Sequence, residues 1–355
     1  MKVPKKIDKF RRVLFRSITR QIGSNAKKQD LRNIEPDKIK KVLIIRPNHR
    51  LGNLLLTTPL VQEITTTFPN AHIDFLAKGM LAPIVFKNYK NVTNFILLHK
   101  RPFDNILSYL SIWLKMPFKK YDLVINTVKC SSSGKLLTKI TPATYKIYEY
   151  EDDENTKSQT IHHAKEAVIA MRTALYGSDL EKVTKEVPML AIKCSDEELQ
   201  KGKDILASLM GETENIIAIF TFATGDKCYS KEWWSTFYQH LLVAFPDHQI
   251  VEILPYENVS QIDFKATSFY SKDIREMASV MAACNIFIGA DSGIMHLACA
   301  SGVPTLGLFS GRMEQFRPYG KNNNAVDISS TGIAYWTEEI KGILNPSPKA
   351  IDQEH

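Results

Sequence analysis

The stretch that most constrains the fold of this chain is residues 285–309, NIFIGADSGIMHLACASGVPTLGLF. A short apolar run stops at GADSG, and apolar residues at the i, i+3, i+4 spacing of a helix follow from Ile294. Pro304 ends this helix, and residues 305–309 are typical of a second buried strand. The succession of strand, tight turn, short helix and strand predicts half of a parallel α/β sheet.

The turn in this stretch has the composition of an anion-binding site. Asp291 or Ser292 can cap the helix, and Gly293 permits another molecule to approach the backbone closely. The free N–H groups of the first helical turn, with the helix dipole behind them, suit a ligand such as a diphosphate. His296 lies one turn further along and is placed to reach the same ligand. A capped helix with a core histidine is the alternative that this stretch leaves open.

The composition predicts a soluble protein with two α/β domains. The chain has 355 residues, of which 44% are hydrophobic and 24% charged, enough for two separate cores. Its five cysteines form no C-x-x-C pair, which favours reduced thiols over disulfides or zinc ligands. Apolar stretches are broken well before ~20 residues and no apolar signal region begins the chain. We therefore expect a cytoplasmic protein without a transmembrane helix or a metal centre.

Positive charge is concentrated at the N-terminus. Residues 1–41 hold fourteen Lys and Arg against four acidic residues, whereas the rest of the chain is slightly acidic. A globally basic nucleic-acid binder is therefore excluded. Apolar residues recur on one helical face among these basic residues: Val3, Ile7, Phe10, Leu14 and Ile18. This pattern predicts a helix that binds an anionic membrane surface through residues 1–28, or else a helix that packs on its own domain.

A first α/β domain is predicted from residue 40. Residues 41–45 are a β-branched run typical of a buried parallel strand, followed by the polar loop RPNHRLGN. A helical pattern and further strands at 71–76, 121–126 and 144–148 give a doubly wound succession. The loop after the first strand of such a sheet faces the ligand crevice. Its candidate site residues are Arg46, His49, Arg50 and Asn53.

A second α/β domain is predicted after a crossing at residues 182–188. Its first strand, residues 215–220, ends in a loop that carries the hydroxyl of Thr224 and the cation of Lys227. The predicted organisation is a basic arm (1–39) and an N-terminal domain (40–185), followed by a C-terminal domain (186–332) and a final helix with a polar tail (333–355).

The chain lacks the common catalytic motifs. It contains no G-x-G-x-x-G, Walker lysine loop, H-E-x-x-H or nucleophile elbow. A diphosphate-type pocket in the second domain and a basic loop in the first suit group transfer from a nucleotide-linked donor to an acceptor. The donor would be held by the second domain and the acceptor by the first.

Two stretches resemble a known family. Residues 41–75, KVLIIRPNHRLGNLLLTTPLVQEITTTFPNAHIDF, resemble the opening of glycosyltransferase family 9, the heptosyltransferases of lipopolysaccharide core assembly. GADSGIMHLACASGVPTLGLF, followed by FRPYG at 316–320, resembles the donor-binding signature of that family. The resemblance covers residues 40–320. It implies a GT-B fold, in which two Rossmann-like doubly wound domains face each other across a cleft.

The same resemblance implies an activity. It indicates inverting, metal-independent transfer from a nucleotide-diphosphate sugar, ADP-heptose in the family, to a lipid-linked acceptor at the inner membrane face. Asp291, Gly293 and His296 match the donor motif, and Ser292 replaces the usual threonine while keeping a hydroxyl. Lys227 matches the lysine that would pair with the diphosphate and stabilise its growing negative charge. An exposed loop lysine is its alternative role.

Asn53 departs from the family pattern. The family reads Gly-Asp here, and that aspartate is taken to be the general base for the acceptor hydroxyl. Asparagine cannot accept the proton, and a positioned base contributes roughly 10²–10⁴-fold to the rate. Either His49 takes the proton while Asn53 orients the acceptor, or the acceptor supplies its own base, or the protein binds without catalysis. Arg46 and Arg50 would meet an anionic acceptor, or form salt bridges between domains.

We therefore predict a glycosyltransferase of family 9 type that acts on a lipopolysaccharide-core or other envelope glycolipid and lies peripherally on the cytoplasmic membrane. Its expected partners are a nucleotide sugar, the glycolipid and an anionic membrane surface, without nucleic acid or a separate cofactor. A non-catalytic GT-B-like module that binds a nucleotide sugar or glycan is the alternative. A GT-B sugar-nucleotide epimerase would need paired carboxylates in the cleft, and the sequence offers no convincing pair.

Overall fold

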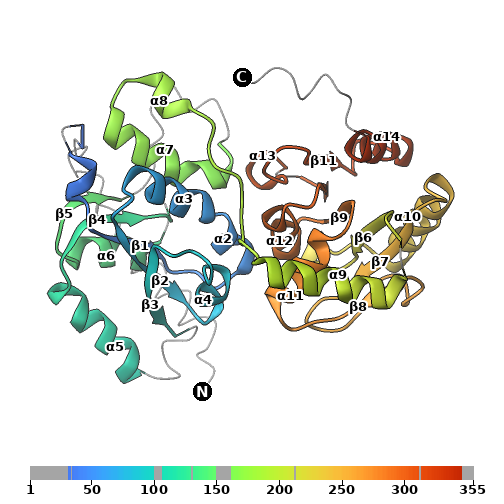
Figure 1. The fold of residues 1–355 in the computed structure, drawn as a ribbon, viewed down its shortest axis with the longest axis horizontal. Helices are drawn as coiled ribbons and strands as arrows, with labels where there is room; N and C mark the ends of the chain where they lie inside the picture. Colours follow the sequence, from blue (N-terminus) through green and yellow to red (C-terminus); the bar gives the residue numbers. More distant parts are fainter. Residues whose placement is uncertain are drawn as a thin grey trace. The chain divides into compact units, whose positions relative to one another are not determined.

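The chain is described by a computed structural model in two compact units (Figure 1). Unit 1 runs to Gln159 and includes His163–Pro188, and unit 2 comprises Thr160–His162 and Met189–His355. The structure describes residues 31–32, 34–99, 106–128, 131–148, 161–211, 213–311 and 313–345. The amphipathic pattern of residues 1–28 and the polar tail beyond residue 345 lie outside the described residues.

Unit 1 is built on a parallel sheet with the strand order β3-β2-β1-β4-β5 among its described residues. The middle strand β1 is the β-branched run expected from the sequence, and its residues from Val42 to Ile45 are fully buried. A strand that helices cover on both faces is buried on both sides, and its sequence is therefore a continuous apolar run. The strands are β1 (Lys41–Arg46), β2 (His72–Lys78), β3 (Val92–Leu98), β4 (Tyr121–Asn126) and β5 (Ala143–Ile147).

Helices cover both faces of this sheet. On one face, α5 and α6 pack on a core that includes Leu43 and Ile45. On the other face α3 lies beside α7, where the guanidinium of Arg172 donates two hydrogen bonds to the Glu63 carboxylate at 2.7 and 2.9 Å (Figure 1). The helices are η1 (Pro36–Lys38), α2 (Leu51–Leu55), α3 (Thr58–Thr67), α4 (Leu81–Val85), α5 (Ile106–Lys115), η3 (Met116–Phe118), α6 (Ser132–Ile140), α7 (His163–Tyr176) and α8 (Leu180–Thr184).

Unit 2 has a second parallel sheet, with the order β11-β10-β9-β6-β7-β8 among its described residues. Read from the first strand of the unit, this is the strand order of a Rossmann fold, in which the direction of winding reverses between β6 and β9. The strands are β6 (Ile216–Phe220), β7 (Gln249–Ile253), β8 (Thr267–Phe269), β9 (Ile286–Ala290), β10 (Thr305–Phe309) and β11 (Asn324–Asp327).

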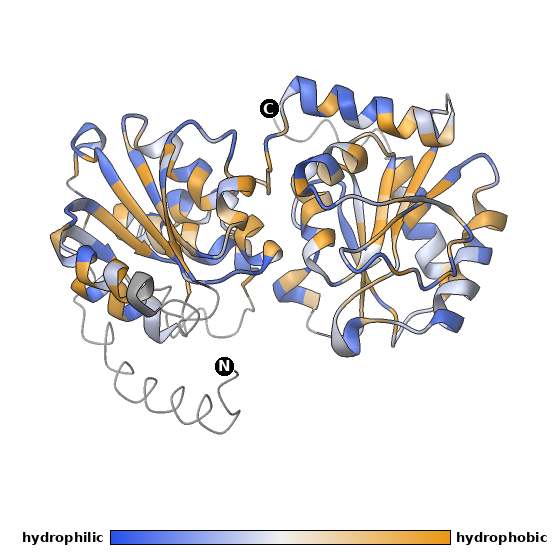
Figure 2. Cartoon of the chain, turned by 90° about the horizontal axis from the view of Figure 1, so that it is seen from below, coloured by the Kyte–Doolittle hydropathy of each residue, from blue (hydrophilic) through white to orange (hydrophobic). Residues whose placement is uncertain are grey.

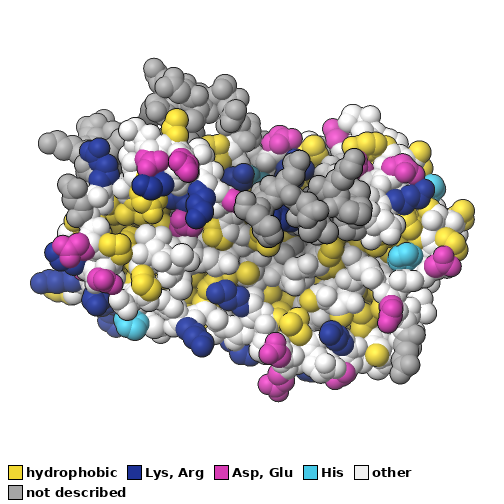
Figure 3. Space-filling model, turned by 45° about the horizontal axis from the view of Figure 1, so that its top comes forward, with side chains coloured by type: hydrophobic (Ala, Val, Ile, Leu, Met, Phe, Trp, Pro, Cys, Tyr) yellow, Lys and Arg dark blue, Asp and Glu magenta, His cyan; other side chains and the backbone are white. Residues whose placement is uncertain are grey.

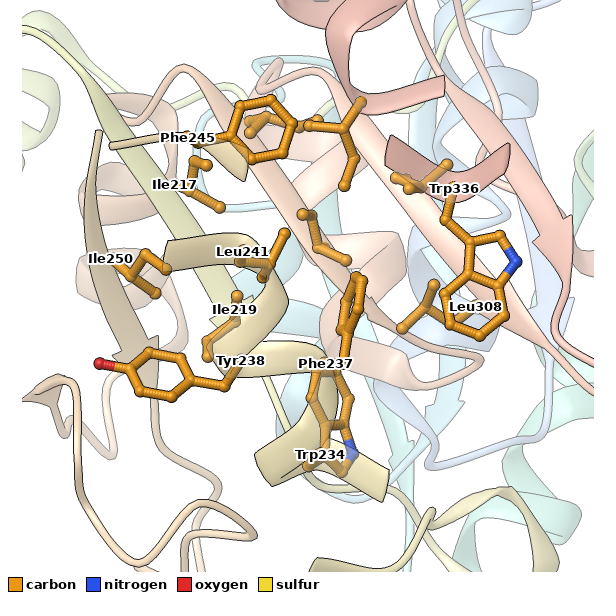
Figure 4. Close-up of a cluster of buried hydrophobic side chains, with 14 of the residues drawn as sticks. Ile217, Ile219, Trp234, Phe237, Tyr238, Leu241, Phe245, Ile250, Leu308 and Trp336 are labelled. Carbon is orange, nitrogen blue, oxygen red and sulfur yellow. The ribbon is translucent and has the colours of Figure 1, made fainter. Parts of the chain in front are cut away.

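The two faces of the second sheet are packed differently. Aromatic side chains of α10 and α14, including Trp234, Phe237 and Trp336, fill one side (Figure 4). On the other side α9 and α11 lie so close that Gly202 of α9 abuts the backbone of Ser279. The helices are α9 (Asp196–Met210), η4 (Gly225–Lys227), α10 (Lys231–Ala244), α11 (Ile274–Ala282), α12 (Gly293–Ser301), α13 (Met313–Phe316) and α14 (Ile333–Leu344).

The predicted doubly wound α/β fold is confirmed in both units. Hydrophobic residues concentrate along the central strands of both sheets (Figure 2). The elements that the sequence analysis missed are mostly short or at a sheet edge. Strand β3, for example, exposes Thr93 and Asn94, which interrupts the apolar run.

Candidate active site

Two groups of polar side chains lie at the carboxyl ends of the strands where each sheet reverses its winding. In unit 1 this point lies between β1 and β4, and in unit 2 between β6 and β9. Open α/β sheets bind their ligands at such positions, because the two adjacent loops diverge there and leave a crevice. Every site residue predicted from the sequence belongs to one of these two groups or to the helix that follows it.

The group in unit 2 centres on Lys227, at the end of η4. Its ammonium Nζ forms an ion pair with the Asp291 carboxylate, which directly follows β9. The same Nζ lies 5.7 Å from the centre of the Phe316 ring in α13, within reach of a cation–π interaction. The Lys227 side chain stays half exposed. A cation held at a sheet switch point, yet accessible to solvent, can receive a phosphate.

The beginning of α12 supplies a second source of positive potential. Ser292 is the N-cap residue, and its hydroxyl accepts a hydrogen bond from the Met295 backbone N–H at 3.2 Å. The helix starts at Gly293, so no side chain there covers the first turn. The other backbone N–H groups of this turn have no acceptor within the helix, and they point toward the carboxyl edge where Lys227 lies.

His296 and Thr224 occupy different environments around this group. His296 is buried, and its backbone N–H donates to the Ser292 carbonyl at 3.4 Å, so it lies one turn inside α12. Thr224 is exposed and precedes η4, where Gly225 turns the chain at φ 67°. Contact of either side chain with a ligand stays a prediction.

Further residues of unit 2 that support this group were not identified from the sequence. The Tyr229 hydroxyl donates to the Leu308 carbonyl at 2.9 Å, and burial raises its pKa to about 12. His162 hydrogen-bonds the Arg317 carbonyl at 2.9 Å and stacks on Tyr319, with ring centres 4.9 Å apart. The FRPYG motif could have pointed to Phe316 and Tyr319, whereas nothing in the sequence connects His162 to it.

The buried carboxylate of Glu252 hydrogen-bonds to the loop after β7. The carboxylate of Glu252 accepts hydrogen bonds from Thr221 at 2.6 Å and from Ser260 at 2.7 Å. Burial raises the pKa of this carboxyl, while the two hydroxyl donors oppose the shift. Thr221 directly follows β6 and begins the loop that leads to Lys227, and Ser260 lies in the loop after β7. The Glu252 carboxylate therefore links these two loops by hydrogen bonds.

The group in unit 1 begins with Arg46, the last residue of β1. Its guanidinium NH1 donates to the Thr127 carbonyl at 2.6 Å, and its Nε is buried without a hydrogen-bond partner among the described residues. Burial lowers the pKa of Arg46 to about 10, and the negative charge of Glu166 opposes that shift. A half-buried arginine with an unused donor at the carboxyl edge is suited to an anionic group.

The loop after β1 presents the remaining predicted residues. The Asn48 side chain accepts the Arg50 backbone N–H at 2.9 Å, which folds the loop into the start of α2. His49 and Arg50 are exposed there. Asn53 is half-buried in α2, and its carbonyl accepts the Thr57 hydroxyl at 3.0 Å. The structure therefore places Arg46 at the end of β1, His49 and Arg50 on the loop that follows, and Asn53 in α2.

The described part of the chain has no group of three or more His, Cys, Asp or Glu arranged to hold a metal ion.

None of the described helices combines the length and the apolarity needed to cross a bilayer. Positive and negative side chains are interspersed over the face shown in Figure 3.

The two parallel-sheet α/β units have the fold of the GT-B class. Solved structures with this fold include a glycosyl transferase of family 9 from Veillonella parvula DSM 2008, which is 18% identical at a TM-score of 0.67 over 90% of this chain and 93% of that one. Escherichia coli heptosyltransferase WaaC, solved with ADP, is 16% identical at a TM-score of 0.63 over 85% of this chain and 99% of that one.

The sequence comparison identifies the family. The profile of glycosyltransferase family 9 (heptosyltransferase) matches residues 110–333, more than half of the chain, and the chain belongs to this family. Lipopolysaccharide heptosyltransferase 3 of Escherichia coli K12 is 24% identical over 299 residues, which cover 76% of this chain and 83% of that protein. The predicted family is confirmed.

Proposed function

We propose that this enzyme transfers a heptose or related sugar from an ADP-linked donor to a lipopolysaccharide-core or other envelope glycolipid. The observation that carries the proposal is the cluster of Lys227, Asp291 and the start of α12 at the switch point of unit 2. Two similarities support the choice of substrates. A solved structure with this fold holds ADP, and a relative is named as a lipopolysaccharide heptosyltransferase.

The donor diphosphate binds at this cluster. Its oxygens accept hydrogen bonds from the first-turn N–H groups of α12 and from the Lys227 ammonium, which the diphosphate shares with Asp291. Negative charge grows on the diphosphate as the sugar departs. The lysine and the helix N-terminus therefore stabilise the transition state more than the ground state, in the role that a metal ion plays elsewhere.

Transfer is a single displacement with inversion. The acceptor hydroxyl oxygen forms a bond to the anomeric carbon while the bond from that carbon to the diphosphate oxygen breaks, and the nucleoside diphosphate leaves with the electron pair. The hydroxyl proton passes to a base. His49 is our candidate, because it is exposed on the loop that also carries Asn53. A phosphate of the acceptor is the alternative base, and Arg46 and Arg50 bind its anionic groups.

The acceptor determines where the enzyme works. A lipid-linked acceptor lies at the cytoplasmic face of the inner membrane, and residues 1–28 hold the protein there through their basic and apolar side chains. A non-catalytic module that binds a nucleotide sugar or glycan is the second candidate. It is favoured by one observation, which is that Asn53 stands where a general base is expected.

Calorimetric titration with ADP, GDP and UDP, in the presence of a chelator, tests the donor half of the proposal. We expect ADP to bind most tightly and the affinity to fall in His296→Ala, which removes a buried side chain one turn inside α12. Incubation with ADP-heptose and a core glycolipid then separates the two candidates by the appearance of product. Absence of binding by every nucleotide would overturn the donor assignment.

A further inference from the structure

The outer face of α5 and the following η3 turn is apolar and open to solvent. Leu110, Leu114 and Phe118 follow one another at intervals of four residues, and their exposed fractions are 48%, 70% and 86%. Within α5 such spacing places Leu110 and Leu114 on one helical face, and Phe118 follows in the η3 turn. The opposite side of the segment is already used, because Ile112, Trp113 and Met116 pack against the core of unit 1. The exposed residues therefore have no core of their own to fill.

All charged residues of the same segment are lysines. Residues 106–120 contain Lys115, Lys119 and Lys120 and no Asp or Glu. Lys115 and Lys120 are exposed, whereas Lys119 lies 3.7 Å from the Asp74 carboxylate. We use the name α5 surface for Leu110, Leu114, Lys115, Phe118 and Lys120. It combines apolar side chains with positive charge, as interfacial helices do.

The segment that carries the α5 surface leads into a strand that lies beside the start of β1. The η3 turn ends next to β4, and the backbone N–H groups of Lys40 and Lys41 both donate to the Asp122 carboxylate of β4 at 2.8 Å. Lys40 and Lys41 are themselves exposed. The chain therefore enters β1 beside the strand that follows η3, and basic side chains continue from one segment to the other.

The α5 surface also leaves the site of unit 1 free. Helix α5 covers one face of the sheet, on the side opposite α3 and α7 (Figure 1). The residues proposed to bind the acceptor lie at the carboxyl edge of β1 instead. A large flat partner can cover the outer side of α5 without covering that edge.

We propose that the α5 surface docks unit 1 on an anionic phospholipid bilayer. Leu114 and Phe118 insert among the acyl chains and headgroups, while the lysines contact lipid phosphates. A second copy of the chain is a poorer partner, because two such surfaces would bring like charges together. The inference deepens the proposed function by giving the folded domain, besides the arm, a contact with the membrane that carries the acceptor.

Co-sedimentation of the full chain with vesicles of phosphatidylglycerol and phosphatidylethanolamine tests the proposal. Leu114→Ser/Phe118→Ser should bind about tenfold more weakly, because two inserted apolar side chains are lost. The matched control is Leu180→Ser/Val243→Ser, which changes side chains of similar exposure, 72% and 80%, outside the α5 surface and should bind normally. Lys115→Gln/Lys120→Gln should weaken binding to these vesicles and leave the weak binding to phosphatidylcholine unchanged. The control Lys203→Gln/Lys265→Gln should not weaken binding to these vesicles.

Two results would overturn the proposal. One is unchanged vesicle binding by Leu114→Ser/Phe118→Ser, with thermal melting showing that the variant is folded. The other is a dimer of the full chain that these substitutions dissociate without changing vesicle binding, which would assign the surface to a second copy. ADP titration of the same samples separates this proposal from the proposed function, since vesicle binding does not depend on nucleotide.

Discussion

The ammonium of Lys227 is paired with the carboxylate of Asp291, although the two residues are 64 positions apart in the sequence. Lys227 follows β6 and Asp291 follows β9, and these strands are neighbours at the point where the sheet of unit 2 reverses its winding. The ion pair holds the cation at this switch point. In the proposed donor site, the diphosphate shares the lysine with the carboxylate.

Lys227→Ala should weaken ADP binding by roughly 10- to 100-fold, the usual effect of losing a hydrogen bond to a charged group. Isothermal titration calorimetry measures the change. Lys231→Ala is the matched control, because Lys231 is also paired with an aspartate, Asp263, away from the switch point. If the Lys227→Ala variant and the parent protein bind ADP equally well, Lys227 is not part of the donor site.

His49→Ala should lower kcat by roughly 10²–10⁴-fold with donor affinity unchanged, if His49 accepts the acceptor proton. Asn53→Ala should have a smaller effect, since Asn53 then only orients the acceptor. Asn53→Asp restores a carboxylate and should recover turnover in the His49→Ala background. Steady-state kinetics with ADP-heptose test all three. A fully active His49→Ala variant would instead favour a base supplied by the acceptor.

Deletion of residues 1–28 should lower affinity for anionic vesicles by at least about tenfold, because each basic residue near the surface contributes up to ~1 kcal/mol. The deletion should leave thermal stability unchanged, and residual binding should remain through the α5 surface. Vesicle flotation and differential scanning calorimetry are the measurements. Undiminished flotation after the deletion would contradict a membrane role for the arm.

Gly202→Ala should destabilise the protein by about 1–3 kcal/mol, the usual cost of overpacking. An added Cβ would meet the Ser279 backbone of α11, which cannot move aside as a flexible side chain can. Gly342→Ala in α14 is the control, because nothing lies near the position of its added Cβ. Urea denaturation compares the two variants, and equal midpoints would show that α9 and α11 can separate without cost.

Stability should fall as pH rises above the ordinary glutamate range, owing to Glu252. Burial raises the pKa of this carboxyl in the folded protein, so folding takes up a proton between the unfolded and folded pKa values. The stability from this group is therefore complete below the unfolded pKa and is lost as pH passes the folded one. In urea titrations, Glu252→Gln should lose less stability than the parent as the pH rises above the ordinary glutamate range. Parallel pH profiles would contradict this assignment.

The predictions from the sequence were strongest where apolar runs were continuous. Strand β1, strand β9 and helix α12 lie within a residue or two of their expected positions, because buried parallel strands and a capped, Pro-terminated helix have local signals. Of the two N-cap candidates, Asp291 and Ser292, the structure has Ser292 as the N-cap. Strand β8 has only three residues and β11 only four, and neither was predicted, since such short edge strands have no distinctive period.

The sequence by itself determined the fold class, the family and the loops that carry the candidate residues, because strand, turn and helix signals are local and the two family motifs are continuous in the chain. Only the tertiary structure decided which of these residues meet. The pairing of Lys227 with Asp291, the contact of His162 with Tyr319 and the exposed stripe on α5 all depend on strand order and helix packing. These are properties of residues distant in sequence, and no local pattern encodes them.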